Sequence, residues 1–137
     1  MTLARGYSLI ELVVVLVVAG IMAAIVMPQF NQPDIDASWY QEQIKAALRY
    51  GQRQAVAQRR NVYVVVSAAN VRLCYDAGCA APVSDFGSGA PFTTKSAPSG
   101  VALVPQTFSF DAMGQPSAGA PFTIDGVVVE ADTGYVR

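Results

Sequence analysis

The feature of this sequence that most constrains its fold is an apolar run near the N-terminus. No side chain from Leu12 to Met27 is polar, and Glu11 is the charged residue within the larger apolar block. A helix from Tyr7 to Met27 would be roughly 30 Å long, about the thickness of the hydrocarbon core of a bilayer. The run therefore predicts a helix that spans a membrane.

Charge distribution predicts that the rest of the chain is exported. Arg5 precedes the run, and no Lys or Arg follows it before Lys45, so the positive charge stays on the cytoplasmic side. Two alternatives are a secretory signal peptide that is removed and a simple uncleaved anchor. The end of the run offers no good pair of small residues for a signal peptidase. An uncleaved anchor would leave Glu11 unexplained.

Glu11 needs a partner, because a charge at the centre of a membrane helix costs roughly 2.5–3.5 kcal/mol, and less near an end. If the chain were cut between Gly6 and Tyr7, the new α-amino group would be a cation at the depth of Glu11 in neighbouring copies. We expect Glu11 and the Tyr7 ammonium to pair between subunits. Such a pair would set the register of an assembly.

Residues 5–12, Arg-Gly-Tyr-Ser-Leu-Ile-Glu-Leu, resemble the type IV prepilin processing signature. The resemblance implies that a prepilin peptidase cuts after Gly6 and methylates Tyr7, that Glu11 serves in subunit assembly and that Pro28 kinks the helix. Tyr7 and the serine after it replace the more usual phenylalanine and threonine, which affects the efficiency of processing. The implied partners are prepilin peptidase, other pilin or pseudopilin subunits and the inner membrane before assembly. The implied precursor crosses that membrane once, with its C-terminal domain in the periplasm.

A second helical pattern follows Pro28 and Pro33, where missing amide donors predict a kink or a break. Asp36 or Ser38 is expected to cap this helix. Its apolar residues recur at spacings of three and four and predict a stripe that packs on a sheet. The stripe consists of Tyr40, Ile44, Ala47, Leu48, Gly51 and Ala55.

Basic residues lie along the same stretch and at its end, and we call them the basic ridge: Lys45, Arg49, Arg53, Arg59 and Arg60. They are typical of a solvated helix face. The alternative is an interaction ridge for acidic faces of neighbouring subunits or for DNA phosphates. No aromatic interleaving supports DNA, and nine Lys and Arg against ten Asp and Glu give a net charge of −1. The composition therefore makes no case for nucleic acid.

Beyond Arg60 the pattern changes to short β-type runs separated by turn residues. Asp125-Gly126 is the strongest hairpin signal, and residues 80–100, rich in Pro, Ser, Gly and Ala, predict an exposed loop. The predicted strands of an antiparallel sheet are 62–66, 71–75, 101–104, 107–110, 122–124 and 127–130.

Cys74 and Cys79 enclose four residues. In an exported domain a nearby pair is more often a disulfide than a metal site. A bridge across so short a loop would contribute up to ~2 kcal/mol if unstrained. The alternative, a redox or metal role, is weakened because the chain has no histidine and two cysteines cannot complete a zinc shell.

The second half is similar to the GspH/FimT-like group of minor pilins and pseudopilins, in residues 108–114 and 127–136. Among these, minor pilins of mannose-sensitive haemagglutinin pili are the nearest resemblance. The two resemblances imply the α+β type IV pilin fold, with a long N-terminal helix packed on an antiparallel sheet. The expected parts are a leader (1–6), a transmembrane and assembly helix (7–27), the second half of the helix (28–60) and a β domain (61–137).

Three functional classes follow from these patterns. The first is a structural minor subunit of a type IV pilus or of a type II secretion pseudopilus. The second is a minor pilin with an adhesive or DNA-binding surface, and the third is a soluble or simply anchored exported domain. An enzyme is disfavoured because the chain has no histidine, no Gly-x-Ser-x-Gly and no glycine-rich phosphate loop, and no cofactor is expected.

Overall fold

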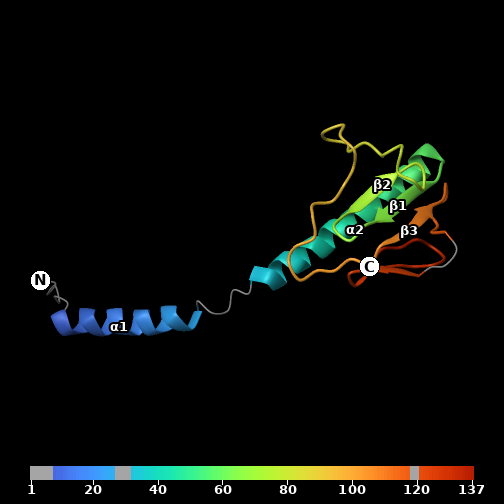
Figure 1. Ribbon diagram of the computed structural model, residues 1–137. Helices are drawn as coiled ribbons and strands as arrows, with labels where there is room; N and C mark the ends of the chain where they lie inside the picture. Colours follow the sequence, from blue (N-terminus) through green and yellow to red (C-terminus); the bar gives the residue numbers. More distant parts are fainter. Residues whose placement is uncertain (1–7, 27–31, 118–120) are drawn as a thin grey trace, which may run out of the picture. The chain divides into compact units, whose positions relative to one another are not determined.

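The computed structural model describes residues 8–26, 32–117 and 121–137, with two helices and five strands of an α+β protein (Figure 1). The chain divides into two compact units, Met1–Gln32 and Pro33–Arg137. The predicted α+β class is confirmed and is consistent with a pilin fold. The predicted kink at Pro28 lies outside the described residues.

Helix α1, Leu9–Val26, is apolar on every side. The backbone amides of Glu11 and Leu12 donate to the Ser8 carbonyl at 3.0 and 3.3 Å, so Ser8 occupies the N-cap position. Within the described part of the chain, no helix has both the length and the apolar character needed to cross a membrane. The predicted span, Tyr7–Met27, has both of its end residues outside that part.

Helix α2, Gln32–Gln58, starts earlier than predicted, so Asp36 and Ser38 lie inside the helix and do not cap it. Pro33 is its second residue, and the first turn accepts proline because amides there lack a partner within the helix. The predicted stripe is confirmed, since all six residues from Tyr40 to Ala55 are buried. A Cβ on Gly51 would lie 3.0 Å from the Leu73 side chain, so the helix backbone packs closely on a strand.

Helix α2 ends in a Schellman motif. The Arg60 amide donates to the Ala55 carbonyl at 3.2 Å and the Arg59 amide to the Val56 carbonyl at 3.3 Å. Arg59 occupies the left-handed position, with φ of 49°, where glycine is more usual. The helix therefore ends two residues before the predicted boundary at Arg60.

Three strands form one antiparallel sheet in the order β2–β1–β3: β1 is Val62–Val66, β2 is Val71–Cys74 and β3 is Gln106–Phe110. Val64 of β1 faces Leu73 on one side and Phe108 on the other, and all three are buried. Strands β4, Phe122–Ile124, and β5, Val127–Val129, form a separate hairpin. The expected single sheet is thus two, with Phe122 stacked on Phe108 at 4.3 Å between ring centroids.

The hydrophobic core lies within the unit Pro33–Arg137. It joins the α2 stripe to the inward residues of both sheets and to residues of the connecting segments. Its buried members are Tyr40, Ile44, Leu48, Ala55, Val62, Val64, Val66, Val71, Leu73, Val83, Leu103, Phe108, Phe110, Ile124, Val127, Val129 and Val136.

The predicted strand at 101–104 is wrong, because the structure has no strand there. Leu103 is nevertheless buried, while Val104 is 74% exposed. An alternating pattern indicates which side chains contact the core, and this segment contributes Leu103 to the core without pairing with another strand. The pattern alone cannot supply a partner strand.

The predicted exposed loop, 80–100, is only partly exposed. Its backbone follows the free edge of β2: the Val83 amide donates to the Leu73 carbonyl at 2.9 Å, and the Thr94 amide to the Val71 carbonyl at 2.9 Å. Val83 is 1% exposed. The segment therefore covers an edge strand that would otherwise present unpaired amides and carbonyls.

Candidate functional site

The N-terminal candidate site is built around Glu11 in the first turn of α1. An acid at this place is favoured by the unpaired amides at a helix N-terminus. Gly6 and Tyr7, the predicted cleavage and methylation residues, lie outside the described residues. The expected pair between Glu11 and the Tyr7 ammonium therefore stays a prediction.

Ser8 has a structural role at this site that the sequence did not lead us to predict. Ser8 and Glu11 have the Ser-x-x-Glu spacing of a capping box. The backbone bonds to the Ser8 carbonyl agree with an N-cap at this position. The three-residue spacing of Ser8 and Glu11 can be read from the sequence, and it predicts that α1 begins directly after Ser8.

The surface of α1 is apolar and exposed. The exposed fractions of its large apolar side chains range from 47% at Val13 to 82% at Leu9. A helix that is hydrophobic all round is normally buried in lipid or among other helices. Moving each such side chain from water into lipid or into a bundle of helices is favourable by about 1.5–3 kcal/mol. The exposed residues are Leu9, Ile10, Leu12, Val13, Val14, Val15, Leu16, Val17, Val18, Ile21 and Met22.

The basic ridge is not one uniform surface. Lys45 forms an ion pair with Glu42 at 2.8 Å, and Arg49 donates to the Val136 carbonyl at 3.1 Å. The Arg60 guanidinium lies 3.9 Å from the centroid of the Tyr75 ring. These three side chains therefore have partners within the chain.

Arg53 and Arg59 complete the basic ridge. Both are exposed, and neither side chain has a hydrogen-bond or ion-pair partner among the described residues.

The hydrogen bond and charge of Lys45 hold the pKa of the Glu42 carboxyl below its usual value. Glu42 therefore stays ionised and offsets part of the positive charge of the basic ridge.

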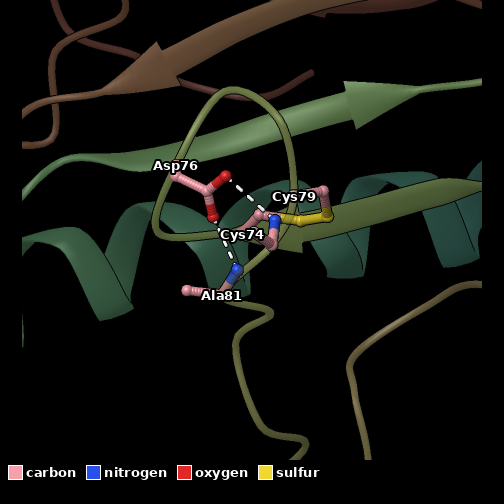
Figure 2. The surroundings of a disulfide bond; sticks show 5 residues. Cys74, Asp76, Cys79 and Ala81 are labelled. Carbon is pink, nitrogen blue, oxygen red and sulfur yellow. Dashed lines mark hydrogen bonds between the residues drawn. A yellow bond between two sulfur atoms is a disulfide. The ribbon is translucent and has the colours of Figure 1, made fainter.

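The disulfide expected between Cys74 and Cys79 is present in the structure, with 5.1 Å between the two Cα atoms. Figure 2 shows the Asp76 carboxylate inside the closed loop. It accepts from the Ala80 amide at 2.9 Å and from the Ala81 amide at 2.7 Å. These two bonds lower the pKa of Asp76. The loop is therefore held by a covalent bond and by a charged acceptor, and it fixes the end of β2.

The two segments that carry the second resemblance meet at Gln52 of α2. The Gln52 side-chain amide donates to the Gly114 carbonyl at 2.9 Å and to the Thr133 carbonyl at 3.1 Å. Gly114 and Gly134 have φ of 82° and 66°, in the region that favours glycine. A Cβ on Gly134 would collide with the Gly114 carbonyl oxygen. The turns therefore form one junction, in which both glycines are buried, that holds the C-terminal segment on α2.

Metal chemistry receives no support in the described ranges, where no group of three or more His, Cys, Asp or Glu residues could hold an ion. The chemistry that the described side chains offer is apolar burial, ion pairing and hydrogen bonding.

Residues 1–27 match the prokaryotic N-terminal methylation motif. This match supports a type IV pilin-like protein, made as a precursor that prepilin peptidase processes and that assembles with other pilins. Searches of curated proteins and of solved structures gave no match.

Proposed function

We propose that this chain is a structural minor subunit of a type IV pilus or of a type II secretion pseudopilus. Prepilin peptidase cuts the precursor between Gly6 and Tyr7 and methylates Tyr7. The mature subunit then joins a filament through α1. The observation that carries this proposal is an exposed apolar helix that lies within the match to the methylation motif, residues 1–27, and has a single acid, Glu11, in its first turn.

The proposed location before assembly is the inner membrane, with residues 7–27 in the bilayer and the C-terminal unit in the periplasm. Arg5 ahead of the apolar run supports this orientation. The Cys74–Cys79 disulfide also supports it, because disulfides persist in the oxidising periplasm. The proposed subtype, the GspH/FimT-like group, rests on residues 108–114 and 127–136, which meet at Gln52. Membership among mannose-sensitive haemagglutinin minor pilins is the narrowest form of this proposal.

Glu11 is the residue that tests the assembly mechanism. Glu11→Ala removes the carboxylate, and Glu11→Gln removes only its charge, so both should be cleaved and inserted but excluded from filaments. Loss of a charge partner in a water-poor environment costs several kcal/mol, enough to lower incorporation more than tenfold. Glu42→Ala is the matched control, because Glu42 is an exposed acid outside α1.

The readouts are mass spectrometry of the mature N-terminus and the amount of subunit in sheared filaments. A methylated N-terminus at Tyr7 is the expected product. A mature protein that begins at Met1 or downstream of Glu11 would refute the processing proposal. Normal incorporation of the two Glu11 variants would refute the register mechanism alone.

A DNA-binding surface is the second candidate, and it rests on Arg53 and Arg59, whose side chains have no partner among the residues that the structure describes. Binding through phosphates would weaken as salt rises, with a slope that reports the number of contacts. Arg53→Ala combined with Arg59→Gly should abolish such binding, whereas Lys45→Ala, whose side chain is already paired, should change it little. Salt-sensitive binding that survives the double change would exclude this surface.

A further inference from the structure

A groove lies between α2 and the segment that follows residue 91. Three of its lining side chains are aromatic: Trp39 and Tyr50 from α2, and Phe92. Its volume is about 420 Å³, within the size range of small binding pockets, roughly 300–1,000 Å³. The Tyr50 and Phe92 rings stack with their centroids 5.1 Å apart, while Trp39 is 54% exposed. The groove therefore offers an aromatic surface to an apolar group from outside.

One of the residues that line this groove, Lys95, is positively charged. The Lys95 ammonium lies 4.9 Å from the centroid of the Trp39 ring. Lys95 and Asp36 both line a smaller adjoining cavity of about 120 Å³, but the described residues show no ion pair between them. The groove thus combines aromatic walls with a cation that has no acidic partner in the described part of the chain.

The unit Pro33–Arg137 also has an exposed aromatic side chain, Phe86, that could occupy such a groove. Phe86 is 94% exposed. It belongs to the turn of a hairpin-like segment, residues 83–92 (yellow in Figure 1), whose base is closed by the Phe92 amide donating to the Val83 carbonyl at 2.7 Å. The Asp85 amide also donates to the Ala90 carbonyl at 2.8 Å. An ordered backbone therefore presents Phe86 to the surroundings.

The residue before Phe86 is an acid, and its negative charge is opposite to that of Lys95 in the groove. Asp85 precedes Phe86, and the Ser88 hydroxyl donates to its Oδ2 atom at 2.9 Å. The other carboxylate oxygen of Asp85 has no hydrogen-bond partner among the described residues. An aromatic side chain next to an acid thus complements an aromatic groove next to a cation.

We propose that Phe86 of one copy of this chain inserts into the Trp39–Tyr50–Phe92 groove of a second copy, and that Asp85 pairs there with Lys95. With 94% of its side chain exposed, Phe86 does not fill the groove of its own chain. A buried aromatic anchor in a pocket, flanked by a charge pair, is the arrangement that dominates many protein interfaces. The contact deepens the proposed function, because it requires two copies to be neighbours in the assembly.

A photo-crosslinking residue tests this contact in the full-length protein in its own membranes. Phe86 is replaced by benzoylphenylalanine, which keeps an aromatic ring at the tip, and illumination should give a covalent dimer. The attachment should map to peptides that contain Trp39–Tyr50 or Phe92–Lys95. Met113, which is 81% exposed, is the matched control position and should give no dimer.

A charge exchange supplies the second arm. Asp85→Lys should lower the dimer yield about tenfold, and adding Lys95→Asp should restore it, because the pair is re-formed with reversed signs. Failure of the exchange to restore the yield, a product with another protein only, or no dimer at all would overturn the proposal. Cleavage at Gly6 and filament incorporation are measured in the same cells, so this contact can fail while the proposed function stands.

Discussion

The junction at Gly134 gives a stability prediction whose size follows from the structure. Gly134→Ala places a methyl group where it collides with the Gly114 carbonyl oxygen and lies 2.8 Å from the Gln52 side-chain nitrogen. A left-handed backbone costs alanine roughly 1–2 kcal/mol. Moving packed backbone to make room costs about 1–3 kcal/mol, and weakening the bond from Gln52 costs about 1 kcal/mol. We expect a total loss of about 3–6 kcal/mol.

Gly89→Ala is the matched control for this substitution. Gly89 has φ of 68°, against 66° for Gly134, but a Cβ there would have no atom within 4 Å. Both variants therefore carry the cost of a left-handed backbone, but only Gly134→Ala causes a collision. The control should lose about 1 kcal/mol or less, because alanine also reduces the entropy of the unfolded chain. The difference between the two variants, about 2 kcal/mol or more, reports the collision itself.

Urea unfolding of the unit Pro33–Arg137 measures both variants. The fluorescence of Trp39, the one tryptophan in the chain, follows the transition. The two free energies of unfolding can be compared when both variants unfold with the same dependence on urea concentration. Equal losses, within about 0.5 kcal/mol, would refute the close approach of the Gly114 and Gly134 turns.

Two further predictions concern the ends of α2 and β2. Arg59→Gly should raise the free energy of unfolding by about 1 kcal/mol, because Arg59 occupies the left-handed position of the Schellman motif, whereas Arg59→Ala should not. Urea unfolding of both variants checks this, and equal stability would contradict it. The hydrogen bonds from Ala80 and Ala81 lower the pKa of Asp76, so their stabilisation is complete above the unfolded pKa of about 3.9 and is lost as pH falls through the folded pKa. Acid titration of wild type and Asp76→Asn should therefore differ in slope below about pH 4, and identical profiles would contradict the assignment.

The sequence predicted those features that depend on neighbours close in the chain. The apolar character of α1 and the buried stripe of α2 follow from helical spacing. The turn at Asp125-Gly126 has φ of 48° and 81°, as a two-residue hairpin turn requires. Strands β1 and β4 have their predicted bounds. Each of these features is encoded in a few consecutive residues.

The candidate site was predictable only in its N-terminal part. Glu11 stands out because a charge interrupts an apolar run, and Ser8 could have been found by its spacing from Glu11. The groove of Trp39, Tyr50 and Phe92 could not, because its sides lie about forty residues apart in the sequence. The basic ridge was identified as a set, but which of its members have partners depends on residues as distant as Val136.

Local pattern determined the helices, most strands and the turns of this protein, together with the unusual acid in α1. Tertiary structure decided that residues 80–100 cover the edge of β2, that Leu103 is buried without a strand and that the Gly114 and Gly134 turns meet at Gln52. The physical reason is the range of the interactions. Side-chain periodicity and turn chemistry act over a few residues, whereas edge pairing, grooves and close backbone contacts exist only when distant segments are brought together.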